Sequence, residues 1–572
     1  MFAQLMREML TPNTFESFRV YSLDTLARMK EALVLVDDVR RGRIPVATLH
    51  PIMDEIDWSL DKDPVARLLA ESEIKSLKAV VAQKAKTNFP LDLFASHLKL
   101  IMKLVGATYK ETVEQQIVES IGRQRDAINL RKLTGFYCSF LINAGYLRGH
   151  VLQTLNAYFF DNPVQRMGAA KVSKFFREFD CKQKKFLVYA TVTQELSNYL
   201  MASNFIVHDN SRLTPAQSTA LTRNPNFRQT PSFTQFETEQ LDPHGAANEA
   251  YQSLSSHRAI AFLDPHGMHC DWGDRMYVTR PRAQSGISVG RNEFMLRFPA
   301  YNRSRMPRWR SIANHAKAIN SSFDAPSTER LLSSINTAAL ATNSTNPENQ
   351  LISLWSAFEV LLSDPRDVPR IVHYNELIAP CIAYRHARRQ MAAVYNGLLV
   401  IYRRRFLDLI WRAEPSRTPD AANAFAKLIM LPEHEGLRTE LCALIANNPL
   451  ALHRTWKLHS DYGTPKKVHD ALTDHLNRVT WQIHRIYRAR NQLVHSGRTP
   501  TYLESVIINA AEYYRAATSA IVRSALKEGG KSDVDQIVAE IGIRNRIYHS
   551  KFDKRGNEPM TPDDVTLIMS PT

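Results

Sequence analysis

The residues most able to do chemistry lie in one short run, RARNQLVH, which contains Arg490, Asn491 and His495. A histidine titrates near neutral pH, so it can take a proton from a ribose 2′-hydroxyl or return one to a leaving group. An arginine offers a fixed fork of donors to a phosphate whose charge grows in the transition state. Together these groups suffice for cleavage of RNA through a 2′,3′-cyclic phosphate, with no metal or other cofactor.

The surrounding sequence predicts that these residues end an amphipathic helix over about 467–495. Apolar residues recur there at steps of three and four and define a buried stripe: Leu476, Val479, Ile483, Ile486 and Val494. Arg490 falls almost on this stripe, and a charged guanidinium on an apolar face must be paired. Ser496-Gly497 is the expected stop, which puts His495 in the last turn, where a site can open to solvent.

Arg490 and His495 are five residues apart, so a regular helix points them about 140° away from each other. They can share a site only near a helix end or across an interface that pairs two such helices. Arg488 lies seven residues before His495, shares its face more directly, and is a candidate accessory group. The structural alternative is coincidence, since this arginine–histidine spacing is common in helical proteins.

Three stretches together resemble the Apea-like branch of the HEPN superfamily: RIYRARNQLVHSG, the run TYLESVIINAAEYYRAATSAIV behind it, and LISLWSAFEVLL well ahead of it. The resemblance covers about 350–527. It implies a helical bundle that dimerises so that both motifs line one cleft, and many members are metal-independent ribonucleases of antiphage or toxin systems. Carried over by position, Arg490, Asn491 and His495 match the family motif. Glu359 stands in the first bundle helix, where such proteins often place a polar active-site residue.

A second copy of the pattern follows in IGIRNRIYHSKF, with Arg544, Asn545 and His549. Three roles stay open for it: a structural helix, a flank of the cleft, or a second site.

The chain is strongly basic. Lys and Arg total 73 against 57 Asp and Glu, which gives a net charge of +16 and a pI near 9.5. Such an excess favours a polyanionic partner, because neutralising phosphates releases counterions. RNA, with tRNA as one candidate, is the partner expected for an arginine-rich helical segment that contains Arg385, Arg388, Arg389, Arg403, Arg404 and Arg405. The run RFPAYNRSRMPRWR interleaves arginines with aromatics, which fits either base stacking or a solvated basic loop.

Other patterns mainly exclude function classes. The segment DPHGMHCDWGD crowds metal donors, but no paired ligands follow at zinc-like spacing, so a polar loop is favoured and no metal site is expected. Five cysteines without short spacings indicate reduced thiols in a cytoplasmic protein. The chain lacks a Gly-rich phosphate loop, which argues against NTP hydrolysis. It also lacks a signal peptide and an apolar run of roughly 18 residues, so no membrane contact is expected.

A chain of 572 residues exceeds one hydrophobic core, and the pattern predicts a mainly α protein with a smaller α+β middle region. Residues 1–160 are expected to form a helical regulatory domain, with a helix that opens at Asp63-Pro64. Residues 161–340 carry the β-prone runs KKFLVYATVT, HRAIAFLD, DRMYVTR and NEFMLRF, with a polar loop near 210–247. Residues 350–572 are expected to form the helical nuclease domain.

The resulting hypothesis is a metal-independent endoribonuclease of bacterial antiphage defence, acting by abortive infection. It would be at least a dimer, restrained by its other domains until a phage-derived or cellular trigger arrives. One alternative is a catalytically silent HEPN module that serves as an RNA-binding or assembly scaffold. Another is a DNA-binding regulator, for which the sequence contains no convincing helix-turn-helix.

Overall fold

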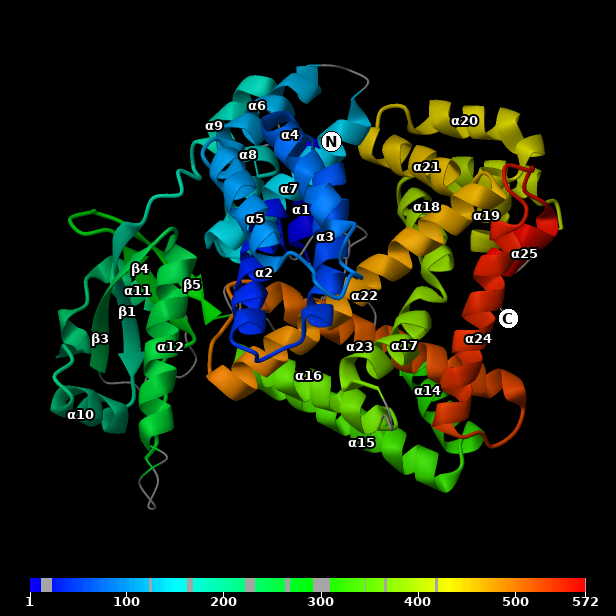
Figure 1. The fold of residues 1–572 in the computed structure, drawn as a ribbon. Coiled ribbons are helices and arrows are strands. Elements are labelled where there is room, and N and C mark those ends of the chain that lie inside the picture. Colours follow the sequence, from blue (N-terminus) through cyan, green and yellow to red (C-terminus); the bar gives the residue numbers. More distant parts are fainter. Residues whose placement is uncertain are drawn as a thin grey trace.

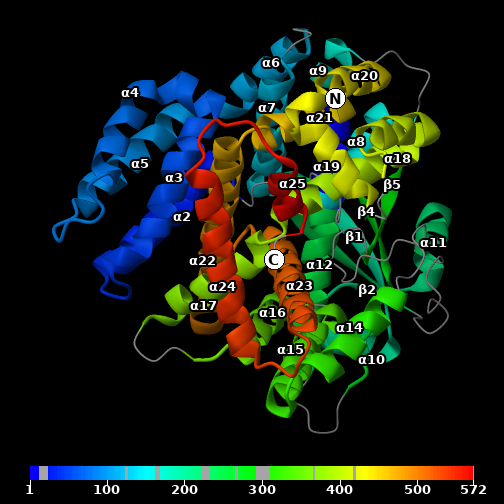
Figure 2. The same cartoon turned by 90° about the vertical axis from the view of Figure 1, so that its right-hand side faces the viewer.

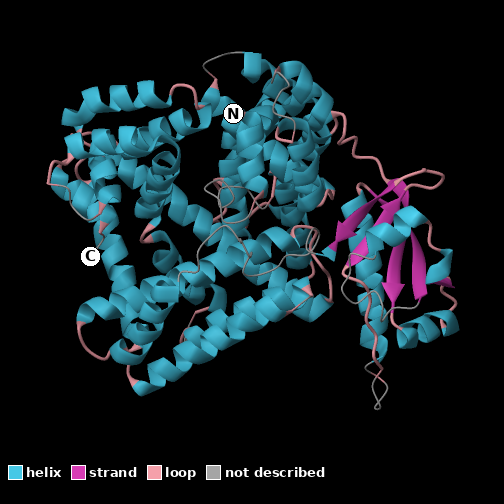
Figure 3. Ribbon diagram, turned by 180° about the vertical axis from the view of Figure 1, so that it is seen from behind, coloured by secondary structure: helices cyan, strands magenta, loops and turns pink. Residues whose placement is uncertain are grey.

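A computed structural model of the chain describes all residues except 12–22, 123–125, 162–167, 222–231, 262, 264–267, 292–308, 345, 365–367, 417–419 and 571–572. Helices dominate this described part, and one small antiparallel sheet lies in the middle of the chain (Figures 1 and 3). The predicted fold class, mainly α with a smaller α+β middle region, is confirmed at this level. Within the same residues, none of the helices has the length and apolarity needed to cross a membrane.

The N-terminal region is helical, as predicted, and its helices share one core. They are α1 (Phe2–Leu10), α2 (Thr25–Arg40), α3 (His50–Lys62), α4 (Pro64–Val81), α5 (Leu91–Gly106), α6 (Tyr109–Gly122), α7 (Ala127–Ala144), α8 (Arg148–Phe159) and α9 (Ala169–Phe176), with a 3-10 turn, η2, at Val46–Leu49. The expected start at Asp63-Pro64 is confirmed. The Asp63 carboxylate accepts hydrogen bonds from the backbone N–H groups of Val65 and Ala66, which caps α4.

The sheet has the strand order β2-β3-β1-β4-β5, with antiparallel neighbours throughout. Its elements are β1 (Lys184–Val192), α10 (Gln194–Ala202), β2 (Val207–Asp209), η3 (Asn210–Arg212), α11 (Pro215–Leu221), β3 (Ser232–Gln240), α12 (Pro243–Ala261), β4 (Arg275–Thr279) and β5 (Gly286–Gly290). Alternate residues of β1, from Phe186 to Val192, are buried in a core with Ala246, Ala250 and Leu254 of α12. Helix α12 therefore covers one face of the sheet.

Two local predictions for this region are wrong. The run HRAIAFLD was expected to be β-prone, but His257–Ala261 continue α12, because the helix is set by its upstream residues packing on the sheet. The polar stretch 210–247 was expected to be a loop, yet it contains α11, β3 and the start of α12. Strand β3 lies between β1 and β2, so backbone pairing on both edges outweighs its polar composition. The run NEFMLRF lies outside the described residues.

The C-terminal half is helical again and builds two cores. Its helices are α14 (Trp309–Ser322), α15 (Ala325–Asn343), α16 (Pro347–Leu361), α17 (Arg370–Ala383), α18 (His386–Ala413), α19 (Ala421–Met430), η5 (Pro432–His434), α20 (Glu435–Ile445), α21 (Pro449–Tyr462), α22 (Pro465–Ser496), α23 (Leu503–Glu528), α24 (Val534–Asp553) and α25 (Pro562–Met569). The first core joins α14–α17 to α23 and parts of α22 and α24. Residues 309–340, assigned to the middle region from the sequence, thus pack with α16.

Helix α22 passes through the middle of the molecule and contributes to both C-terminal cores (Figures 1 and 2). Val468 and Leu472 near its start pack with α18, α19 and α21, whereas Ile483 and Ile486 pack with α16 and α23. It ends at Gly497, whose φ of 62° is the left-handed conformation that stops a helix. The predicted stop at Ser496-Gly497 is confirmed.

The N-terminal region docks on α22 through a buried charge network, which consists of Arg28, Glu31, Glu55, Arg485 and Arg488. Nη2 of Arg485 lies 3.0 Å from a Glu31 carboxylate oxygen and also pairs with Glu55, and its side chain is 1% exposed. Arg488 pairs with the other Glu31 oxygen at 2.8 Å, and Arg28 pairs with Glu55 at 2.9 Å. Burial alone would raise the pKa of Glu55, but Arg485 and Arg28 lower it to about 2. Burial also opposes the charge of Glu31, but Arg485 and Arg488 lower its pKa below the ordinary value. Both carboxylates are therefore ionised at neutral pH.

The charge network should dominate the stability of this interface. We expect Glu31→Gln to lower the free energy of unfolding by roughly 3 kcal/mol or more, because it leaves buried arginines without a full counter-charge. Fluorescence-detected denaturation is suited to the measurement, since Trp58 and Trp481 lie in the interface with ring centroids 5.6 Å apart. The control is Glu440→Gln, which breaks an exposed pair with Arg412 and should leave stability unchanged. Equal effects of the two substitutions would contradict a structural role for the network.

Candidate active site

Arg490 is held by a short chain of polar contacts between α22 and α16. Nη2 of Arg490 lies 3.5 Å from a carboxylate oxygen of Glu359, and Nη1 donates to Oδ1 of Asn491 at 3.1 Å. The other Glu359 oxygen accepts a hydrogen bond of 3.0 Å from Nε1 of Trp355, a side chain that is only 1% exposed. The buried tryptophan thus orients the carboxylate, and the carboxylate orients the guanidinium.

This arrangement supplies the partner that the sequence required for Arg490. Three residues named from the sequence, Glu359, Arg490 and Asn491, lie together. The side chains of Arg490 and Glu359 remain 21% and 24% exposed, so the pair reaches the surface. Nε of Arg490 is buried and has no hydrogen-bond partner among the described residues.

His495 lies beyond this pair, at the exposed end of α22. In the described part of the chain, no hydrogen bond or ion pair joins it to Arg490, Asn491 or Glu359. Val494 was expected in the buried stripe but is 47% exposed, because the last turn of α22 extends past the core. One copy of the motif therefore does not bring its arginine and histidine into contact.

Arg488, the predicted accessory group, forms an ion pair with the N-terminal region. Its guanidinium pairs with Glu31 of α2, and its side chain is 10% exposed. The hydroxyl of Tyr502, at the start of α23, also donates to Glu31 at 3.5 Å. Arg488 is thus part of the contact between the N-terminal region and α22.

The residues of the second copy of the motif contact neighbouring helices and side chains. Asn545 is 3% exposed, and Arg544 pairs with Glu528 at 2.5 Å. The ring of His549 lies edge-on to that of His469, with centroids 6.0 Å apart, and burial lowers the pKa of His549 to about 4. These contacts favour the structural reading among the three left open.

The six arginines proposed for RNA binding fall into two groups. Arg388 pairs with Asp420 at 2.9 Å, and Arg389 donates to the backbone carbonyl of Ile382. Burial, together with the nearby charges of Arg523 and Arg388, lowers the pKa of Arg385 to about 10. By contrast, Arg403, Arg404 and Arg405 are exposed on α18, where Arg403 kinks the helix with a φ of 45°. The second group is open to a polyanion, and Arg389 of the first group is also exposed. In the run RFPAYNRSRMPRWR, every arginine side chain lies outside the described residues.

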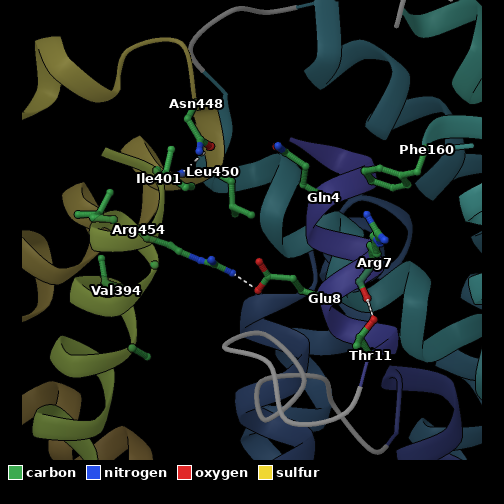
Figure 4. Close-up of a pocket in the computed structure, with 14 residues that line it drawn as sticks. Gln4, Arg7, Glu8, Thr11, Phe160, Val394, Ile401, Asn448, Leu450 and Arg454 are labelled. Carbon is green, nitrogen blue, oxygen red and sulfur yellow. Dashed lines mark hydrogen bonds and ion pairs between the residues drawn. The ribbon is translucent and has the colours of Figure 1, made fainter. Parts of the chain in front are cut away.

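A separate cavity of about 470 Å³ lies between α1 and helices α18 and α21. Figure 4 shows Arg454 reaching across it to pair with Glu8, with Gln4, Arg7 and Phe160 on the side of α1 and α8. The volume suits a small molecule. The residues that line it include none of the motif residues, so it is distinct from the site at the end of α22.

One group of metal-ligating side chains converges among the described residues: His150, Asp242 and His244. The sequence did not predict this group, because His150 stands 92 positions before Asp242 and only the fold brings them together. The signal available was the Asp-Pro-His run at 242–244. In the donor-rich segment DPHGMHCDWGD, Asp264 and His266 lie outside the described residues, and His269 is exposed.

Comparisons of the chain with protein-family models, with curated proteins and with solved structures find no match. The HEPN resemblance therefore rests on the residues named above.

The half-buried histidine of the second motif, His549, should make stability depend on pH. The folded-state pKa of His549, about 4, lies below its ordinary value of 6.5, so between these pH values only the unfolded chain binds the proton. Stability is thus complete above about pH 6.5 and falls as the pH drops toward 4. We expect His549→Gln to flatten the fall in Tm between about pH 7 and pH 5. The exposed His269 gives the control, His269→Gln. An unchanged slope in His549→Gln would show that this histidine is not buried as described.

Proposed function

We propose that the C-terminal helical region cleaves RNA without a metal ion, in a site built around Arg490 and His495. The observation that carries the proposal is the arginine itself. Its guanidinium is anchored by Glu359 and Asn491, and its side chain remains partly exposed. A structural arginine needs only the first of these features, whereas a phosphate-binding arginine needs both.

The chemistry assigned to these residues is transesterification. His495 takes the proton of a ribose 2′-hydroxyl, and the 2′-oxygen forms a bond to phosphorus as the bond to the 5′-oxygen breaks. The leaving oxygen takes up a proton, so the products are a 2′,3′-cyclic phosphate and a 5′-hydroxyl. Arg490 stabilises the added negative charge on the phosphorane, and Asn491 keeps the guanidinium in place.

The separation of Arg490 and His495 in one chain supports a dimer. The two side chains point about 140° apart on α22, and in the second motif Asn545 is buried and Arg544 is paired with Glu528. A two-fold axis beside the ends of two α22 helices would place an arginine from one chain near a histidine from the other. Such a composite site agrees with the exposure of His495 and its lack of contact with Arg490.

The N-terminal region is proposed to restrain the enzyme. It holds Arg488 through Glu31, close to the motif, and a second ion pair joins Arg148 of α8 to Glu504 of α23 at 3.6 Å. Both contacts lie next to the segment 494–503 that carries His495. A trigger that moved the N-terminal helices would act directly on the end of α22, as expected of a toxic nuclease of antiphage defence.

The first test is the chemistry of the RNA ends. The wild-type chain should produce 2′,3′-cyclic phosphate or 3′-phosphate ends and 5′-hydroxyls from total RNA. His495→Ala and Arg490→Ala should each lose at least about a hundredfold in rate, as expected for an acid–base group or a charge-stabilising donor. The matched control is His549→Gln, which should cleave at the wild-type rate. Cleavage that leaves 3′-hydroxyls would contradict the mechanism, and RNA binding without cleavage would favour the silent scaffold.

The second test concerns the composite site. Mixing Arg490→Ala chains with His495→Ala chains should restore part of the activity, because a mixed dimer keeps one intact pair. Each variant alone should stay inactive at the same total concentration. Full activity of the wild type at concentrations where sedimentation detects only monomers would contradict the composite site.

A further inference from the structure

We propose that His150, Asp242 and His244 bind a divalent transition-metal ion, for which Zn²⁺ is the best fit, and that this ion joins α8 to the start of α12. One ligand atom from each residue lies within 4.8 Å of the others. The inference does not depend on the proposed nuclease activity, because the metal would connect two regions and take no part in RNA cleavage.

The donor set is one that zinc prefers. Imidazole nitrogens and a carboxylate oxygen bind Zn²⁺ at about 2.0–2.2 Å, so ligand atoms around a tetrahedral ion lie roughly 3.4 Å apart. The ligand atoms here lie within 4.8 Å of one another, so they must draw closer together when the ion binds. Three protein ligands also leave the fourth position to a water molecule.

The ligands are held in place by contacts of their own. Asp242 is 1% exposed, and its two oxygens accept hydrogen bonds from the backbone N–H groups of Gly245 at 2.8 Å and Leu147 at 2.9 Å. Each oxygen keeps a further lone pair for a metal. The ring of His150 packs against those of Tyr146 and Phe179, with centroids 6.3 and 6.2 Å away. Such fixed surroundings raise metal affinity, because little order is lost on binding.

Capping of α12 explains Asp242 but not the two histidines. His244 is 1% exposed and comes from the first turn of α12, whereas His150 comes from α8, and their ring centroids are 5.6 Å apart. The positive end of a helix disfavours a cation, and the Asp242 carboxylate offsets that effect. The ion would link the N-terminal helices to the helix that covers the sheet.

The test is the zinc content and affinity of the full chain. Wild-type protein that has been stripped of metal with a chelator and dialysed should then bind one Zn²⁺ per chain. The zinc content is measured by mass spectrometry of the metal, and the affinity by competition with a zinc indicator. His150→Gln and His244→Gln should each weaken zinc binding on the order of a hundredfold. His269→Gln, in the other donor-rich segment, should bind like wild type. Loss of zinc in this control alone would overturn the assignment, as would equal binding by all four proteins.

A second measurement uses the wild-type chain alone, so its result does not depend on whether a variant folds. Co²⁺ added to the chelator-treated wild type should give visible absorption bands of a four-coordinate site with nitrogen and oxygen ligands. Zn²⁺ should then displace the cobalt and raise the Tm of the metal-free chain. Absence of these bands in a folded, metal-free wild type would overturn the proposal. The zinc-free protein should produce the same RNA end groups as the zinc-loaded protein. The zinc result and the nuclease result can then be judged independently.

Discussion

The buried charges between α2, α3 and α22 are the constraint on which the rest of the structure depends. Arg485 is withdrawn from water, and its two counter-charges, Glu31 and Glu55, come from helices more than 400 residues away in the sequence. Removing either the arginine or the carboxylates would leave an uncompensated charge in a region of low dielectric. The N-terminal helices and α22 are therefore positioned together, with one face of α22 covered and its C-terminal end exposed.

Within six residues, α22 uses arginine in three different ways, and burial distinguishes them. Arg485 is a structural cation with two carboxylate partners. Arg488 bridges the same network from a less buried position. Arg490 turns to the other side, where Glu359 of its own bundle holds it at a longer distance and solvent reaches it. The apolar stripe of the sequence includes Arg490 but neither Arg485 nor Arg488, so the burial of these two depends on the N-terminal helices that pack against α22.

Much of the fold could be predicted from local pattern, because helical periodicity, the Asp63-Pro64 start and the stop at Gly497 depend on neighbours in the chain. The pairing of Arg490 could be anticipated from its place on an apolar stripe. What failed or was missed depends on contacts between distant segments. Strand β3 is polar in composition but is paired on both edges, and Val494 repeats the helical spacing but lies past the core. Glu31 and Glu55 carry no local signal of their role, and neither does His150, since their partners are supplied only by the fold.

We propose that the end of α22 engages the phosphate that is cleaved. A structure of the full chain with a 2′-fluoro RNA oligonucleotide tests it most directly, because such RNA lacks the attacking hydroxyl and stays intact. We expect a phosphate within hydrogen-bond distance of the Arg490 guanidinium, with a His495 ring from either chain of a dimer facing the adjacent 2′ position. RNA seated only along Arg403, Arg404 and Arg405, with Arg490 still paired to Glu359 and no phosphate near it, would contradict the claim.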